Sequence, residues 1–159
     1  MREILKLIRI RTIVFAVLTM YAMRYWVVLP MLELNGFTLQ MADWAFSLLV
    51  LAVCCLVSGA YVINDYFDIR TDRIAGIRDV VVGRSLSRRS VIILHSVLNV
   101  IAVLIAFYLG FAVGVWKIGI LFFLVSGILW FYSSSYKKYF IVGNVIAALL
   151  ASLIPVSAI

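Results

Sequence analysis

The chain has 159 residues, of which 66% are hydrophobic and 13% charged, and its mean hydropathy is +1.17. Soluble domains average about 45–50% apolar and about 25% charged residues, so this composition excludes a soluble globular domain. The formal net charge is +7, but the sequence offers no exposed domain that would display these charges to a nucleic acid. We therefore expect a multi-pass integral membrane protein that lies in a lipid bilayer and has no nucleic-acid partner.

Five apolar stretches are long enough to cross a membrane as helices. A hydrocarbon core about 30 Å thick takes roughly 20 helical residues to cross. Backbone groups in lipid must find partners within the protein, which favours helices here. In chain order, the expected spans are 12–32, 44–63, 91–113, 116–135 and 140–159. The predicted fold class is therefore an all-α polytopic membrane helical bundle, with residues 1–159 forming a single transmembrane domain.

The basic residues are distributed unevenly between the two sides of these spans. The N-terminal tail, the connection 64–90 and the connection after the fourth span together carry twelve of the 14 lysines and arginines. Cytoplasmic loops of membrane proteins are enriched in lysine and arginine. We therefore expect the N-terminus and the segment 64–90 to be cytoplasmic.

The segment 64–90, expected to be a loop, begins with a ladder of polar residues. Asn64, Asp68 and Asp72 recur at i, i+4 and i+8, with Asp65 beside them. If the second helix continues past the membrane edge, these residues share one helical face. Stacked carboxylates repel one another, and oxygen-only ligands favour Mg²⁺ as the cation that relieves the repulsion. We therefore expect Asp65, Asp68 and Asp72 to bind Mg²⁺.

Six arginines follow in the same segment, and their guanidinium groups suit phosphate oxygens. Together with the carboxylates, they are consistent with a diphosphate site at the membrane surface. An alternative is that the aspartates form ion pairs with Arg70, Arg73 and Arg78 on a solvated helix end. In that case, the chain would be a non-catalytic membrane scaffold or a protein that binds a diphosphate lipid. Spacing alone leaves both interpretations open.

The pattern Asn64-Asp-x-x-Asp68-x-x-x-Asp72, followed by Arg73, resembles the first aspartate-rich motif of the UbiA superfamily of intramembrane prenyltransferases. Further similar stretches follow the family's order: Leu7-Ile-Arg9, Val80 to Arg89, Tyr132 to Lys138, and Gly143-Asn144. The resemblance covers all five expected spans. The family has about nine helices and a second aspartate motif, which has no counterpart in this sequence. We therefore expect an N-terminal fragment that resembles the first half of the family.

This resemblance implies a helical bundle around a cavity and Mg²⁺-dependent transfer of a polyprenyl group from its diphosphate to a lipophilic acceptor. Carried over by position, the metal ligands are Asp65, Asp68 and Asp72, and the catalytic residues are Asp68, Asp72 and Tyr132. Residues implied to bind the diphosphate are Asn64, Arg9, Arg73, Lys137 and Asn144. Without the second motif, we expect this chain to be inactive alone, with the missing C-terminal half as a partner.

Arg24, His95 and Asn99 are three further polar residues within the expected spans. Arg24 either reaches the diphosphate site or pairs with a buried acceptor, and the sequence leaves both possibilities open. His95 and Asn99 stand at i and i+4 in the third span. We expect them to form hydrogen bonds between helices rather than to ligate a metal.

Overall fold

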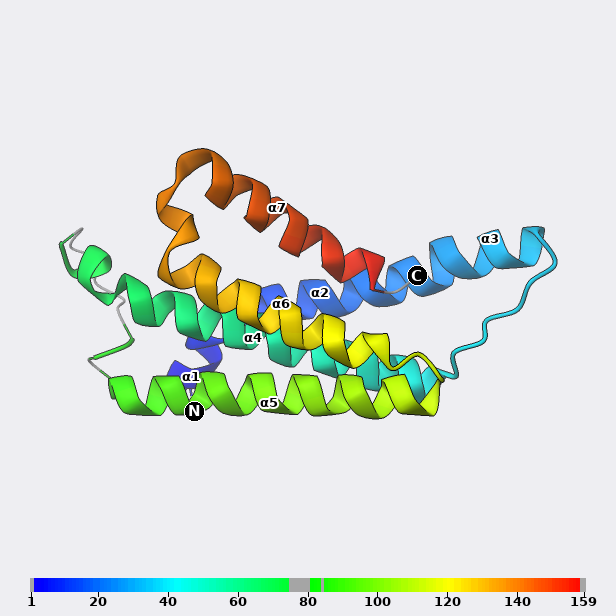
Figure 1. The fold of residues 1–159 in the computed structure, drawn as a ribbon, viewed down its shortest axis with the longest axis horizontal. Helices are drawn as coiled ribbons and strands as arrows, with labels where there is room; N and C mark the ends of the chain where they lie inside the picture. Colours follow the sequence, from blue (N-terminus) through cyan, green and yellow to red (C-terminus); the bar gives the residue numbers. More distant parts are fainter. Residues whose placement is uncertain (1, 75–80, 84, 158–159) are drawn as a thin grey trace.

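The computed structural model describes residues 2–74, 81–83 and 85–157, without the side chains of residues 70, 72, 73, 138, 140 and 142. Over these residues the fold is a bundle of helices, as Figure 1 shows. The elements are α1 (Arg2–Leu7), α2 (Ile10–Ala22), η1 (Met23–Val28), α3 (Leu29–Leu34), α4 (Asp43–Ile74), α5 (Arg88–Ala112), α6 (Lys117–Ser134), η2 (Tyr136–Lys138) and α7 (Phe140–Val156). The predicted all-α fold class is confirmed.

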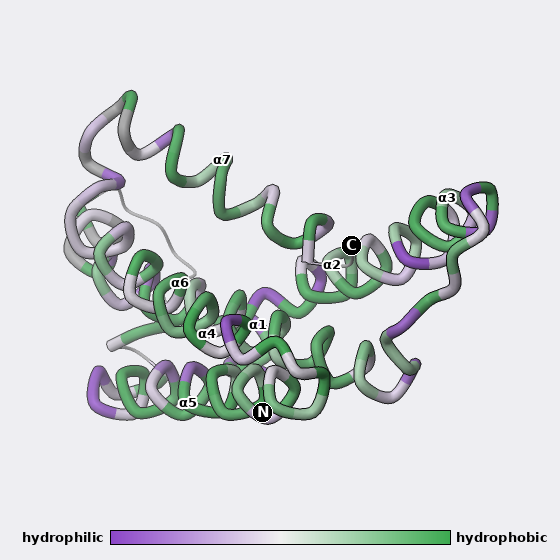
Figure 2. The backbone as a smooth tube through the Cα atoms, turned by 45° about the vertical axis from the view of Figure 1, so that its right-hand side comes forward, coloured by the Kyte–Doolittle hydropathy of each residue, from purple (hydrophilic) through white to green (hydrophobic). Residues whose placement is uncertain are grey.

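Four helical stretches are long and apolar enough to cross a membrane: Ile10–Leu34, Asp43–Ile69, Arg88–Ala112 and Lys117–Ser134. The first runs through α2, η1 and α3. A shorter apolar stretch, Gly143–Val156, lies in α7. Figure 2 shows hydrophobic residues along most of the length of α5, α6 and α7. The four long stretches match the first four expected spans in order, and the shorter one lies within the fifth, 140–159. The chain is a multi-pass integral membrane protein.

Helix α4 forms the centre of the bundle and packs against α5 and α6 (Figure 1). Its buried core includes Phe46 and Ala52 of α4, with Ala106 and Leu109 of α5. Helix α7 is placed differently, because it diverges from α6 after η2 and its far end approaches α2 (Figure 1).

A buried polar network joins α4, α5 and α6. His95 Nδ1 lies 2.9 Å from the carbonyl oxygen of Gly59, and Asn99 Nδ2 donates to the carbonyl oxygen of His95 at 2.9 Å. Ser126 Oγ of α6 donates to Asn99 Oδ1 at 2.6 Å. The prediction that His95 and Asn99 form hydrogen bonds between helices is confirmed. Gly59 permits the close approach, because a Cβ there would lie 2.5 Å from Asn99 Nδ2.

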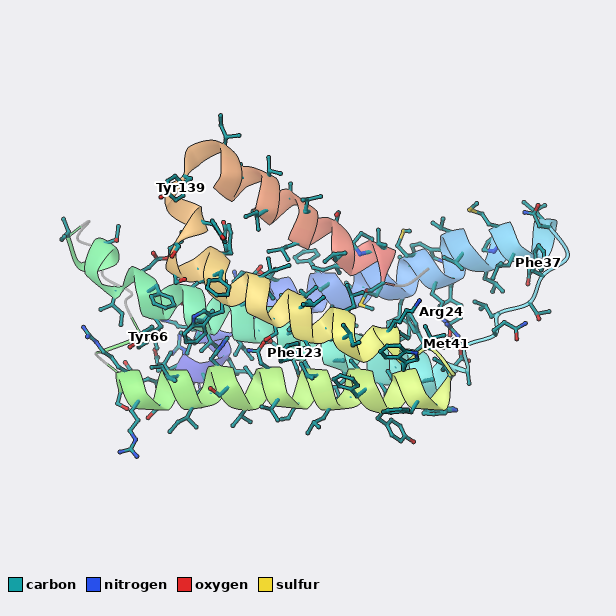
Figure 3. All side chains as sticks on the ribbon, viewed as in Figure 1. Arg24, Phe37, Met41, Tyr66, Phe123 and Tyr139 are labelled. Atoms are coloured by element: carbon teal, nitrogen blue, oxygen red, sulfur yellow. The ribbon has the colours of Figure 1, made fainter. Side chains whose placement is uncertain are left out.

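Arg24 lies in η1, a π-helical turn, and its side chain is buried. Its Nη2 donates to Asp43 Oδ1 at 2.9 Å and to the carbonyl oxygen of Met41 at 2.6 Å. The guanidinium also lies 4.4 Å from the ring centre of Phe46. Figure 3 places Arg24 and Met41 at the end of the bundle opposite Tyr66, which neighbours the aspartates. Arg24 therefore does not reach the diphosphate site, and its side-chain partner Asp43 is exposed (77%) rather than buried, so neither of the two possibilities is observed as expected.

Candidate functional site

The polar ladder lies on a helix, because α4 continues past the membrane-spanning stretch to Ile74. The first eleven residues of the expected loop 64–90 are thus helical. The helical turn brings Asn64 and Asp68 together, and Asn64 Nδ2 donates to Asp68 Oδ2 at 3.0 Å. Asp72 and Arg73 lie on the same helix, but their side chains are outside the described residues. We call this end of the bundle, where Tyr66 lies in Figure 3, the aspartate end.

Lys137 reaches the ladder from the turn that follows α6. Its Nζ donates to Asp68 Oδ1 at 2.5 Å and to Asn64 Oδ1 at 3.2 Å. The side chains of Lys137 and Asp68 are 18% and 27% exposed, so the ion pair is mostly shielded from solvent. The turn η2 and the start of α7 thus present a cation directly to the acidic face of α4.

Arg9 approaches the same face of α4 from the N-terminal segment. Its Nη2 lies 3.3 Å from Asp65 Oδ1, and its guanidinium lies 4.6 Å from the ring centre of Tyr61. Leu7, two residues earlier, is buried and packs with Val62 and Ile69 of α4 in a second small core. This apolar contact holds the junction of α1 and α2 against the aspartate end.

A cavity of about 500 Å³ lies between α4, α6 and α7. Towards the aspartate end, it is lined by the polar or amphipathic side chains of Arg9, Tyr61, Asn64, Tyr132 and Ser133. The rest of the lining is almost wholly apolar and includes Val53, Leu56, Val57, Ala60, Leu121, Phe122, Val125, Leu129, Ala147, Leu150, Ala151, Leu153, Ile154 and Val156. The cavity is therefore amphipathic, with a polar end beside the ladder and a long apolar interior.

The structure gathers most of the predicted site residues at this polar end. Arg9, Asn64 and Tyr132 line the cavity, while Asp65, Asp68 and Lys137 are bonded to residues at its mouth or to one another. Asn144 lies near the start of α7 with an exposed side chain and is not among the lining residues.

Tyr61 is a site residue that sequence reasoning missed. It lies one helical turn before Asn64 and Asp65, so its spacing from the ladder is the signal that would have found it. Ser133 was also missed as a separate site residue. Its Oγ is buried and has no hydrogen-bond partner among the described residues.

Oxygen atoms supply all the candidate metal ligands at the aspartate end. These are the carboxylates of Asp65 and Asp68 and the amide oxygen of Asn64, a donor set that fits Mg²⁺. Among the described side chains, no group of three or more histidine, cysteine, aspartate or glutamate residues is placed to hold a metal ion. Arg9 and Lys137 instead balance the charges of Asp65 and Asp68.

Comparison with known families gives a match that covers α4 to α7. Residues 36–159 match the UbiA prenyltransferase family. No curated protein and no solved structure is significantly similar to the chain. The matched region contains the ladder, Tyr132 and Lys137, whereas Arg9 precedes it. Since the match extends over more than half of the sequence and agrees with the resemblance read from its motifs, the chain belongs to the UbiA prenyltransferase family.

Proposed function

We propose that this protein takes part in Mg²⁺-dependent transfer of a polyprenyl group from its diphosphate to a lipophilic acceptor. The observation that carries the proposal is the amphipathic cavity, which has Arg9 at one end, with Lys137 bonded to the lining residue Asn64, and mostly apolar side chains along the rest. An isoprenoid diphosphate has the matching polarity, because a multiply charged anionic head is joined to a hydrocarbon chain. Burial of that chain against apolar side chains supplies binding free energy in proportion to the area buried.

The diphosphate would bind at the aspartate end. Lys137 and Arg9 supply positive charge to its oxygens, and guanidinium groups suit phosphate geometry. Asn64, Asp65, Asp68 and, by position on the same helix, Asp72 would hold Mg²⁺. When bound, Mg²⁺ stabilises the negative charge of the departing diphosphate. Without ligand, the carboxylates keep both cations at the mouth of the cavity, ready to engage phosphate.

Tyr132 would lie beside the carbon from which the diphosphate departs. It lines the polar end of the cavity near the junction with the apolar interior. The face of an aromatic ring attracts a cation, so Tyr132 would stabilise positive charge developing on the allylic carbon. The apolar lining would keep water away from that carbon and leave it to the acceptor.

We further propose that the aspartate end and the N-terminus face the cytoplasm. The basis is the concentration of lysine and arginine in the N-terminal tail, the segment 64–90 and the turn after α6. The substrate head would then bind from the cytoplasmic side, with its chain extending into the membrane-embedded part of the bundle.

The two ion pairs also favour a second candidate function, a non-catalytic scaffold in which the aspartates are structural. The observed partners of Asp65 and Asp68 are Arg9 and Lys137, 56 and 69 residues away in sequence. Such pairs tie α2 and the turn after α6 to α4. A ligand titration separates the two candidates, because only the first predicts that a diphosphate lipid competes for these cations.

We expect geranylgeranyl diphosphate with Mg²⁺ to raise the melting temperature of the purified chain in phosphatidylcholine nanodiscs. Binding to the folded state alone stabilises it by about 2.7 kcal/mol at a ligand concentration one hundred times Kd. Inorganic pyrophosphate should compete, and geranylgeraniol, which lacks the diphosphate, should give a much smaller shift. An unchanged melting temperature at saturating diphosphate would favour the scaffold. Pyrophosphate release separates a transferase from a diphosphate-lipid-binding protein, and it has to be measured with a C-terminal half present, because we expect the chain to be inactive alone.

A further inference from the structure

The backbone of Arg9 adopts the left-handed conformation, which is unfavourable for a residue with a side chain. Its φ of 52° and ψ of 57° lie in the left-handed region, and it is the one non-glycine residue with positive φ among the described residues. A Cβ makes this region unfavourable, and such conformations persist where the surroundings impose them and concentrate at functional sites. Arg9 stands between the buried Leu7, which packs against α4, and the start of α2, and its guanidinium lies against Asp65 and Tyr61 of α4.

The guanidinium of Arg9 is held by two residues of α4, which act on it differently. Asp65 binds it through a carboxylate at 3.3 Å, and Tyr61, four residues earlier on the same face, lies under it at 4.6 Å. A carboxylate neutralises the cation, whereas an aromatic face attracts the cation and leaves its charge available. The Arg9 side chain is 48% exposed, so an anion in the cavity mouth has access to it.

We propose that Tyr61 is a positioning residue whose ring presents the Arg9 guanidinium to phosphate groups bound at the polar end of the cavity. The inference rests on the proposed function and adds to it a residue outside the aspartate ladder. Both residues line the cavity. If a ligand draws Asp65 away from Arg9, the ring of Tyr61 still holds the guanidinium over the site.

The first test examines the contact without any ligand. In arginine-labelled protein in nanodiscs, the ring current of Tyr61 should shift the side-chain NMR signals of Arg9 upfield. Tyr61→Phe should keep this shift and Tyr61→Leu should abolish it. Arg9 signals that are the same in Tyr61→Leu and the wild type would overturn the proposal.

The second test measures affinity for inorganic pyrophosphate with Mg²⁺ by calorimetry. Tyr61→Leu should weaken binding about threefold to thirtyfold, the range corresponding to a cation–π contact, and Tyr61→Phe should restore it. In an Arg9→Leu background, Tyr61→Leu should cause no further loss, since the residue acts through Arg9. Tyr108→Leu, on an exposed position of α5, is the matched control for loss of a tyrosine.

The calorimetry distinguishes failure of the role of Tyr61 from failure of the proposed function. Wild-type binding that Tyr61→Leu leaves unchanged, or weakens equally with and without Arg9, would overturn the role of Tyr61 alone. Absence of pyrophosphate binding to the wild type would overturn the proposed function and this inference with it.

Discussion

Replacement of Asp68 by alanine is expected to remove the Mg²⁺ dependence of diphosphate binding. With Mg²⁺ present, affinity for geranylgeranyl diphosphate should fall by at least about tenfold to a hundredfold, the range seen when groups that support a metal site are removed. Without Mg²⁺, the substitution should not lower the affinity for pyrophosphate. The substitution frees Lys137 Nζ from its carboxylate partner and removes a negative charge, so metal-free pyrophosphate should bind no more weakly than it does to the wild type.

Isothermal titration of both proteins, with Mg²⁺ and with EDTA, checks this contrast. Glu33→Gln is the matched control, because Glu33 is an exposed acidic residue of α3, far along the chain from the ladder. It should leave affinity unchanged under both conditions. If turnover is measured, pyrophosphate release should follow the same order. Equal loss of affinity with and without Mg²⁺ in Asp68→Ala would contradict a metal-binding role for this carboxylate.

Replacement of Gly59 by valine is expected to cause a marked loss of stability in the bundle. Even the Cβ alone would lie 2.5 Å from Asn99 Nδ2 and 3.6 Å from His95 Nδ1. Helices α4 and α5 would have to separate, and the bond between His95 and the Gly59 carbonyl would break. Overpacking of a close contact costs about 1–3 kcal/mol, and each lost hydrogen bond adds about 1 kcal/mol.

Gly127 of α6 provides the matched control for this substitution. A Cβ at Gly127 would meet no other group within 4 Å, and alanine is favoured over glycine inside a helix by up to about 1 kcal/mol. Unfolding in a denaturing detergent should therefore show Gly59→Val to be markedly destabilised and Gly127→Ala to be as stable as the wild type or more stable. Similar stability of both variants would show that the contact between α4 and α5 is looser than described.

Hydropathy and local spacing were enough to predict the helices and part of the ladder. The apolar stretches lie in lipid, where backbone N–H and C=O groups find no water to bond. A helix pairs these groups within the segment, so the helical state follows from hydropathy. The bond between Asn64 and Asp68 follows from their i, i+4 spacing in a helix that continues to Ile74. His95 and Asn99 were likewise identified as helix-linking residues, because polar groups within an apolar span must find partners.

Long-range pairing could not be predicted in the same way. Among the described side chains, Asp65 pairs with Arg9 of the N-terminal segment and Asp68 with Lys137 of η2. The side chains of Arg70, Arg73 and Arg78, the partners that the alternative names, lie outside the described residues. Lys137 was identified only through family resemblance. Which acceptor Arg24 takes depends on how the segment before α4 carries Met41 and Asp43 to η1. No periodicity in the sequence encodes that path.

The cavity could not be predicted from the sequence either. Its existence depends on α7 diverging from α6, as Figure 1 shows, whereas hydropathy describes each span by itself and does not say how the spans pack. Tyr61 joined the site for the same reason, since only the folded chain shows that the Arg9 guanidinium lies over its ring.

Photolabelling with a prenyl diphosphate that carries a benzophenone near the end of its chain tests the central claim most directly. The claim is that the cavity between α4, α6 and α7 holds the prenyl chain. With Mg²⁺, mass spectrometry should find the label on cavity-lining residues such as Val57, Val125 and Leu150, and excess pyrophosphate should suppress the labelling. Labelling confined to outward-facing residues such as Trp26 and Phe123, and unaffected by pyrophosphate, would contradict the account.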